Sequence, residues 1–413
     1  MVGSDFVDYS FPIKISGKHF TDSEGKPFFW HGDTCWKLFW EFTIDEARTY
    51  LENRAKIGFN VIQVHLLPHR FYQCNRGGDR PFLKEGEITA LNEAYFAHVD
   101  RIVEMGAELN LAFVIAPMWL SSWEQEWHTV FNTETAPLFA KAVATRLKKH
   151  KNIIAWIQGG DDDAPDLRDA INISARVFRE ITPEKPQTYH AWTKGGWTLF
   201  PDAEWMDFCM AYSYSTEYLV EQICDARSLV PTRPVVLGET HYEGNDDITA
   251  EDIRRYAYTA TLCGASGHTY GHKDIWMYTY FWPDAINSEC SHHMRILKEF
   301  VDSINWWELE PVDNLFKFQK KPSRVMPTDL QRWKFFPAMC NKDKTFAVAY
   351  FYDHREFFPD PYWLSDRFEQ YWIDPVSARQ FPLEEPPSWS GHRTPGTNAG
   401  GGQDWILVIS EKA

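Results

Sequence analysis

Cysteine is scarce in this sequence and is not arranged for cross-linking. The seven cysteines are scattered over 413 residues, their number is odd, and no two of them form a CxxC pair. The sequence therefore indicates neither a disulfide framework nor a structural zinc site. Reduced thiols are the simplest interpretation, and they favour a cytoplasmic protein.

Long hydrophobic runs are also missing. No run of about 18 apolar residues occurs, and the start, MVGSDFVDYSFPIKIS, lacks a basic segment followed by an apolar one. We therefore expect a soluble, unexported protein without a membrane partner. A start engineered in place of a native signal peptide would look the same, so export remains an alternative.

Positive charge is in short supply. Lysine and arginine number 42 against 58 acidic residues, and the net charge of −16 is spread along the chain. This balance disfavours nucleic acid, anionic membranes and polyanionic substrates as partners, and favours a neutral or weakly charged substrate.

Several cofactor motifs are absent. There is no HExxH, no HxH closing the first predicted strand, and neither GxGxxG nor GxxxxGK. The run Asp161-Asp162-Asp163 lacks the spacing of a calcium loop, and consecutive carboxylates point in different directions. We predict no metal and no cofactor, and we expect Gly159 and Gly160 to let the backbone turn closely before Asp161.

What the sequence does contain is a repeated pattern of strands and helices. From Phe11 to about Trp307, short apolar runs alternate with stretches of helical period, which is typical of βα units with parallel strands. Eight strands are predicted, at residues 26–33, 59–65, 109–117, 152–160, 186–192, 205–213, 233–239 and 265–272. The predicted fold class is α/β, a (β/α)8 TIM barrel.

Helix boundaries are marked between these strands. Thr43 to Glu46 forms a capping box, and Asn92 is placed to cap the next helix. Later helices are predicted at 134–149, 167–180, 217–228, 250–262 and 291–306, whereas 193–204 leaves room for only a short helical turn.

Helical periodicity stops after Trp307. WKFFPAMC, TFAVAYFY, RFEQYWID and DWILVIS alternate like strands of a small antiparallel β-sandwich domain. We predict a barrel domain at 1–309, with an N-terminal β-hairpin, and a sandwich domain at 310–413. Residues 384–403 read as a Pro/Gly/Ser-rich loop inside the second domain.

Carboxylates follow two of the predicted barrel strands. The active sites of such barrels lie at the carboxyl ends of the strands, where Asp161 and Glu239 are found. A glycosidase needs one carboxylic acid to protonate the leaving oxygen and one carboxylate as nucleophile or base. A separation of roughly 5 Å predicts retention of configuration, and about 6.5 to 9.5 Å predicts inversion.

The other strand ends are rich in aromatic and polar side chains. Trp is abundant, with 19 residues, and indole rings pack against sugar rings. Trp123 and Trp192 could line the same groove. Eleven residues are predicted to bind a carbohydrate substrate: Asp33, Trp36, His65, Trp119, Asp162, His190, Tyr212, His241, Tyr270, His272 and Trp276.

Several motifs in order resemble a known family. FFWHGDTCW (28–36), GFNVIQVH (58–65), NEAYFAHVD (92–100), NIIAWIQGGD (152–161), PVVLGETHYE (234–243), GHTYGHKDIW (267–276) and DWILVI (404–409) are similar to the apiosidase-like (β/α)8 glycoside hydrolases. The resemblance implies Asp161 as general acid, Glu239 as the second carboxylate and a C-terminal β-sandwich, sometimes labelled collagen-binding. It does not extend to the sugar.

Alternatives remain open at several positions. Because GGD is extended to GGDDD, Asp162 rivals Asp161 as the acid, and Asp161 could instead cap a helix. Glu243 could compete with Glu239, but we expect it to support a loop. Asp33 could bind a sugar or orient an Arg or His behind the site, and the histidines, including His69, could bind sugar, tune the carboxylates or be structural.

The predicted function is hydrolysis of a plant-type oligosaccharide or glycoside, with Asp161 as acid/base and Glu239 as nucleophile. The alternatives are a non-catalytic carbohydrate-binding barrel and a metal-dependent barrel hydrolase that uses the aspartate run. The sugar, the linkage, exo or endo action and the oligomeric state depend on loop shape and surface patches, and the sequence does not determine them.

Overall fold

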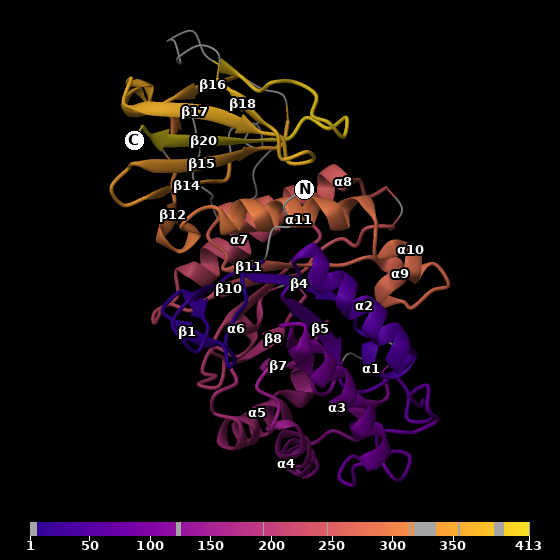
Figure 1. The fold of residues 1–413 in the computed structure, drawn as a ribbon. Coiled ribbons are helices and arrows are strands. Elements are labelled where there is room, and N and C mark those ends of the chain that lie inside the picture. Colours follow the sequence, from indigo (N-terminus) through magenta and orange to yellow (C-terminus); the bar gives the residue numbers. More distant parts are fainter. Residues whose placement is uncertain are drawn as a thin grey trace.

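Eight parallel strands form the centre of the first part of the chain (Figure 1). The computed structural model describes residues 6–120, 125–192, 194–245, 247–313, 315–317, 336–353, 356–383 and 392–412. The strands are β4 (Trp30–Thr34), β5 (Val61–His65), β6 (Ala112–Ala116), β7 (Ile153–Gly160), β8 (Gln187–His190), β9 (Cys209–Tyr212), β10 (Val235–Glu239) and β11 (Gly267–Tyr270).

The sheet curls into a nearly closed barrel. Its strand order is β8-β7-β6-β5-β4-β11-β10-β9. The two outer strands meet where Thr188 Oγ1 donates a hydrogen bond to the Phe208 carbonyl at 2.8 Å and Asp207 N–H donates to the Gln187 carbonyl at 2.8 Å. The predicted set of eight βα units and the TIM-barrel fold class are confirmed.

Helices cover the outside of the barrel. They are α2 (Ile44–Ile57), α3 (Glu93–Glu108), α4 (Ala136–Leu147), α5 (Arg168–Ile181), α6 (Gly196–Leu199), α7 (Thr216–Arg227), α8 (Ala250–Leu262) and α11 (Glu289–Asp302), with short α1 (Leu38–Glu41), α9 (Lys273–Trp276) and α10 (Trp282–Ala285). The capping box at Thr43 and the Asn92 cap are confirmed. No helix in the described ranges is long and apolar enough to cross a membrane.

The last barrel helix differs from the prediction. The sequence pattern predicts a helix at 291–306, but α11 begins at Glu289 and ends at Asp302. The Ser288 side chain caps it by accepting a hydrogen bond from Ser291 N–H. At the other end, Ser303 N–H still bonds to helical carbonyls, and a separate 3₁₀ turn follows at Trp306–Glu308.

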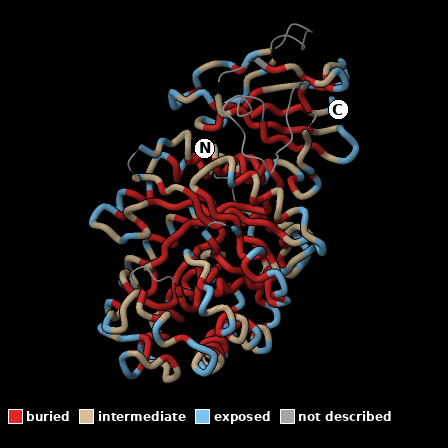
Figure 2. Tube along the Cα trace, turned by 180° about the vertical axis from the view of Figure 1, so that it is seen from behind, coloured by how far each residue is buried: buried red, intermediate tan, exposed pale blue. Residues whose placement is uncertain are grey.

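A small antiparallel sheet closes the amino-terminal end of the barrel. It contains β1 (Lys14–Ser16), β2 (His19–Thr21) and β3 (Pro27–Phe28). Phe20 of β2 packs against Trp30 and Phe208, with ring centroids 5.9 Å and 5.5 Å away. This end of the barrel is therefore filled with aromatic rings, and the opposite end is left for a site. The buried strands form the red centre of Figure 2.

Two antiparallel sheets form the C-terminal part. The larger has the order β12 (Leu309–Pro311), β14 (Ala338–Asn341), β15 (Phe346–Phe351), β20 (Trp405–Glu411), β17 (Phe368–Ile373) and β18 (Gln380–Pro382). The smaller contains β13 (Phe316–Lys317), β16 (Glu356–Pro359) and β19 (His392–Arg393). Aromatic residues of both sheets pack together, which agrees with the predicted sandwich. The predicted loop 384–403 is partly wrong, because β19 pairs with β16 there; residues 384–391 lie outside the described part.

The larger sheet packs on α8 and α11, which lie between it and the barrel strands (Figure 1). Tyr258 of α8 stacks on Tyr350 of β15, with centroids 4.9 Å apart. Arg254 of α8 donates two hydrogen bonds of 2.7 Å to Asp404, and Tyr350 adds a third at 2.9 Å. This buried ion pair joins the two parts of the chain.

We predict that Arg254→Met lowers the free energy of unfolding by about 3 to 5 kcal/mol, because it leaves the Asp404 carboxylate buried without its cation. Chemical denaturation monitored by tryptophan fluorescence measures the change. As a matched control, Arg48→Met removes an exposed pair with Glu52 and should change the free energy by less than about 1 kcal/mol. Equal effects of the two substitutions would contradict the importance of the buried pair.

Candidate functional site

A cleft of about 720 Å³ opens at the carboxyl ends of the barrel strands. Its lining consists mainly of aromatic, histidine and carboxylate side chains: Trp36, His65, His69, Trp119, Gln125, Asp161, Trp192, Tyr212, Tyr214, Glu239, Tyr242, Asn245 and Trp276. The structure thus brings both predicted catalytic carboxylates into one cleft. Predicted substrate-binding residues Trp36, His65, Trp119, Tyr212 and Trp276 line it as well.

Asp161 is held in the cleft by an unusual turn at the end of β7. Gly159 has φ of 124° and Asp161 has φ of 59°, both in the left-handed region. A Cβ on Gly160 would lie 2.2 Å from Trp119 Cη2 and 2.7 Å from the His190 carbonyl. Asp161 N–H donates to that carbonyl at 3.0 Å, and Trp119 Nε1 donates to Asp161 Oδ2 at 3.2 Å. The structure therefore confirms the close backbone turn that was predicted for Gly159 and Gly160.

Glu239 is the last residue of β10 and is only 7% exposed. The pairing of β10 with β9 shifts register between Leu237 and Glu239, an irregularity of the kind that re-aims side chains near sites. Tyr214 donates its hydroxyl proton to Glu239 Oε1 at 2.9 Å. Glu239 is therefore presented to the cleft with a hydrogen bond that stabilises its ionised form.

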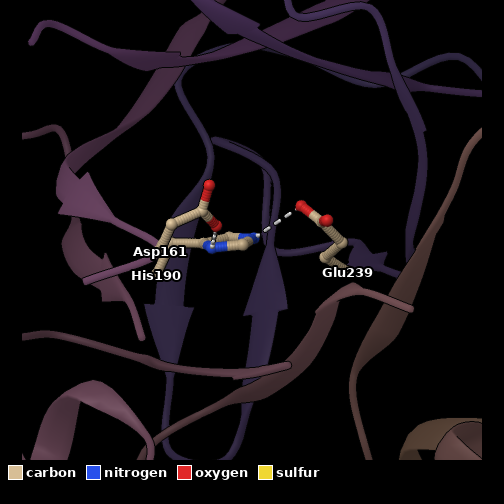
Figure 3. Close-up of side chains that lie close together, drawn as sticks. All are labelled: Asp161, His190 and Glu239. Atoms are coloured by element: carbon tan, nitrogen blue, oxygen red, sulfur yellow. Dashed lines mark ion pairs between the residues drawn. The ribbon is translucent and has the colours of Figure 1, made fainter. Parts of the chain in front are cut away.

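His190 lies between the two carboxylates (Figure 3). Its side chain is fully buried, with Nε2 3.4 Å from Glu239 Oε2 and Nδ1 4.0 Å from Asp161 Oδ1. One atom from each of the three residues can be chosen so that all lie within 4.8 Å of one another. The carboxylate oxygens are therefore at the spacing at which two negative charges repel strongly.

Both carboxylates have raised pKa values. Burial, with a contribution from the Asp162 charge, raises the pKa of Asp161 to about 6, against the hydrogen bond from Trp119. Burial and the Asp161 charge raise the pKa of Glu239 to about 8, against hydrogen bonds from tyrosines. Groups so close titrate as a pair, and near neutral pH the pair holds one proton.

Aromatic rings form two walls of the cleft. On one side Trp36, His65 and Trp119 pack together, with the His65 ring centroid 4.3 Å from that of Trp36 and 4.4 Å from that of Trp119 and the two indoles 5.2 Å apart. On the other side Trp192, 45% exposed, meets Tyr212 and Tyr214 edge to face. Exposed indole on a cleft wall is suited to packing against a sugar ring.

Six of the residues predicted to bind substrate are not among those that line the cleft: the buried His190 and five others. Asp33 is fully buried and accepts hydrogen bonds from Tyr50 at 2.7 Å and Arg54 at 3.2 Å, so it orients an arginine, one of its two predicted roles. Asp162 accepts a hydrogen bond from Ala164 N–H within its own turn. His272 caps α9, since its Nδ1 accepts from Asp274 N–H.

The remaining two of the five contact other loop residues. His241 stacks on Tyr214, with centroids 4.7 Å apart, and its Nε2 lies 3.0 Å from the Tyr214 carbonyl. Tyr270 donates to Glu243, which also accepts hydrogen bonds from Ser288 Oγ at 2.7 Å and Cys290 N–H at 3.2 Å. Glu243 thus ties its loop to the start of α11, the role expected of it. Trp123 lies outside the described residues.

The sequence analysis did not identify four residues of the cleft: Tyr214, Tyr242, Gln125 and Asn245. Tyr214 could have been found, because it follows Tyr212 with the period of a strand and stays on the same side of the chain. Tyr242 accepts a hydrogen bond from Trp36 Nε1 at 3.1 Å, a contact between residues 206 positions apart. Gln125 and Asn245 come from loops, whose paths carry no periodic signal.

Among the described residues, Asp162 and Asp163 of the aspartate run belong to no cluster of acidic and histidine side chains close enough for a cation. Among the residues the structure describes, the one group of acidic and histidine side chains close enough to be considered for a cation is Asp161, His190 and Glu239. The two nitrogens of His190 face different carboxylates, and a single cation could take only one of them. The arrangement is that of two acids separated by an imidazole.

We predict that Gly160→Ala lowers activity by about 100-fold or more, because the new Cβ must displace Trp119 or the chain that carries Asp161. The overpacking should also cost about 1 to 3 kcal/mol of stability. Gly77→Ala is the control, since its nearest neighbour is a side-chain atom at 3.2 Å in an exposed loop. Steady-state kinetics and thermal melting of both variants measure the effects; a fully active Gly160→Ala would contradict the tight turn.

Comparison with solved structures shows the same fold in known proteins. A structure described as a glycoside hydrolase is 24% identical, with a TM-score of 0.84 over 98% of this chain and 97% of that chain. A glycoside hydrolase family 5 protein from Bacteroides vulgatus ATCC 8482 is 22% identical, with a TM-score of 0.83 over 98% and 95%. An endo-1,4-beta-mannanase from Rhizomucor miehei is 12% identical, with a TM-score of 0.51 over 67% and 99%.

A search of curated proteins finds no match. The sequence profile described as "Apiosidase-like, catalytic domain", by contrast, matches residues 15–308. That range contains the whole barrel and every residue that lines the cleft. The chain therefore belongs to the apiosidase-like family, and it is a glycosidase.

Proposed function

We propose that the protein is a retaining glycosidase in which Asp161 is the acid/base and Glu239 the nucleophile. The observation that carries the proposal is the spacing of the two acids, whose nearest oxygens lie within 4.8 Å. Retaining enzymes hold their carboxyl groups about 5 to 5.5 Å apart, whereas inverting enzymes leave room for a water at about 6.5 Å or more. The cleft supports direct attack by a carboxylate.

The reaction proceeds in two steps. Asp161 donates its proton to the glycosidic oxygen while a Glu239 oxygen attacks the anomeric carbon, and the leaving group departs as an alcohol. Asp161, now ionised, takes a proton from water, which attacks the same carbon and releases Glu239. Tyr214 hydrogen-bonds Glu239 Oε1 and supports the negative charge that Glu239 carries before attack and after release.

The substrate we propose is a neutral, plant-type oligosaccharide or glycoside. Aromatic residues provide most of the cleft lining, and no lysine or arginine is among the residues that form it in the described ranges. Such a lining suits the apolar faces of sugar rings and offers no counter-charge to a polyanion. Asp161 faces the aglycone side of the bond, because it protonates the departing oxygen.

Activity should follow a bell-shaped dependence on pH. Below about pH 6 both carboxyls are protonated and Glu239 cannot attack; above about pH 8 both are ionised and Asp161 cannot donate a proton. We therefore expect kcat/KM to be highest between these limits. The measurement is hydrolysis of a substrate with a poor leaving group across pH 4 to 10; a rate that rises steadily to high pH would contradict the need for an acid.

Chemical rescue tests the two roles separately. A panel of aryl glycosides, apiosides included, first identifies a cleaved substrate. Asp161→Ala should then lose about 100- to 10,000-fold on a poor leaving group and much less on an activated one. Azide should restore its rate and yield a glycosyl azide of retained configuration. In Glu239→Ala, azide or formate should act in place of the carboxylate, and azide should give the inverted product.

Two controls accompany the rescue experiment. Asp162→Asn alters the rival aspartate, whose side chain bonds within its turn, and we expect only a small loss. If Asp162→Asn is inactive and Asp161→Asn is active, the acid has been misassigned. Treatment with EDTA tests the metal-dependent alternative, because loss of activity that a divalent cation restores would favour it. Binding of oligosaccharide without cleavage across the panel would favour the non-catalytic alternative.

A further inference from the structure

His190 is a buried polar side chain whose ring nitrogens have no hydrogen-bond partner in the described part of the chain. It ends β8 and is fully buried. Burying such nitrogens costs free energy unless they are used. The two nitrogens face the two catalytic carboxylates, with Nε2 3.4 Å from Glu239 and Nδ1 4.0 Å from Asp161 (Figure 3).

Apart from the two carboxylates, the groups that surround His190 are uncharged. The rings of Trp36, Trp119 and Tyr212 surround it, with centroids 5.9, 5.3 and 4.6 Å away. Its titratable neighbours from other elements are Tyr212 of β9 and His65 of β5; burial raises the pKa of Tyr212 and lowers that of His65, so both are neutral. Burial also lowers the pKa of His190 to about 3, which keeps its ring uncharged.

A neutral imidazole carries one N–H, so it can donate at one nitrogen and accept at the other. If Nε2 carries the hydrogen, it faces ionised Glu239 as a donor, and Nδ1 faces protonated Asp161 as an acceptor. If Nδ1 carries the hydrogen, it faces ionised Asp161 as a donor, and Nε2 faces protonated Glu239 as an acceptor. The first arrangement has the acid protonated and the nucleophile ionised, as the two-step reaction requires.

We propose, on the basis of the function proposed above, that His190 is a positioning residue that directs the shared proton of the catalytic pair to Asp161. The transfer is balanced: Glu239 gives its proton to Nε2 while the hydrogen on Nδ1 passes to Asp161. One proton leaves one carboxyl and one arrives at the other, and the imidazole stays neutral.

The proposal accounts for a difference between the two acids. In the empty cleft the pKa of Glu239 is the higher of the two, which places the proton on the nucleophile. The glycosidase reaction needs it on Asp161. A sugar oxygen beside Asp161 offers that proton an acceptor, and the imidazole provides the path, so the productive state forms when substrate is bound.

A substrate with an activated leaving group isolates this effect, because its cleavage needs an ionised Glu239 but no proton from Asp161. In the substrate complex with His190 present, Glu239 is ionised in the singly protonated pair, and kcat, which reports that complex, should rise with pH near about 6. Without His190 to direct the proton to Asp161, Glu239 keeps the proton. The rise of the rate with pH should then move toward about pH 8. Each unit of displacement lowers the rate about tenfold on the acidic side.

The test compares His190→Asn with His190→Gln on a dinitrophenyl or fluoride glycoside that wild type cleaves. The Asn amide occupies the position of Nδ1 and leaves Glu239 without a donor, whereas the Gln amide reaches the position of Nε2 and can still donate to Glu239. In the Asn variant we expect the acidic limb of kcat to move up by one to two pH units, which lowers kcat about 10- to 100-fold at pH 6. In the Gln variant it should stay within about half a unit of wild type.

The buried His268 of β11 provides a control, since His268→Gln alters the contact with His31 and Phe29 outside the cleft and should not move the limb. The proposal would be overturned if both His190 variants lost rate equally at every pH while the acidic limb stayed where it is in wild type. His190 would then have a structural role only. Equal displacement in the Asn and Gln variants would overturn it as well. Failure of the proposed function is distinguishable, because azide rescue of Asp161→Ala and Glu239→Ala is measured in chains that keep His190.

Discussion

Two carboxylates held within 4.8 Å of each other repel unless they share a proton, and the cleft is organised around that constraint. The aromatic rings on both walls lower the local polarity around the acids and strengthen the repulsion. Tyr214 and Trp119 each donate a hydrogen bond to one of the acids. His190 fills the space between them. The pair is thereby kept in the singly protonated state that the proposed two-step reaction requires.

The positions of both acids depend on glycines that no other residue could replace without movement. A Cβ on Gly160 would meet Trp119 at 2.2 Å, and one on Gly238 would meet Met210 at 2.2 Å. Both strands also shift register near their ends, at Ile157 to Gly160 in β7 and Leu237 to Glu239 in β10. The backbone is therefore irregular and closely packed at the two positions from which the carboxylates project into the cleft.

The C-terminal sheets are connected to this site through α8. The Arg254–Asp404 pair and the Tyr258–Tyr350 stack fix α8 against the larger sheet. The loop that precedes α8 follows Glu239 directly and carries Tyr242 and Asn245 of the cleft lining. The C-terminal sheets, none of whose described residues lines the cleft, therefore support one of its walls.

The sequence by itself determined the eight βα units, four strands of the larger C-terminal sheet (β14, β15, β17 and β20) and the carboxylates at the ends of the fourth and seventh barrel strands, because hydrophobic period, caps and strand ends are local properties. It assigned five residues to the substrate because they lie at strand ends: Asp33, Asp162, His241, Tyr270 and His272. In the structure Asp33 binds Arg54, Asp162 and His272 bond within their own turns, and His241 and Tyr270 contact neighbouring loops. It could not find Gln125 or Asn245 in loops without period. Only the tertiary structure decided the spacing of Asp161 and Glu239 and the place of His190 between them, since these depend on how the barrel closes and how far each strand end projects.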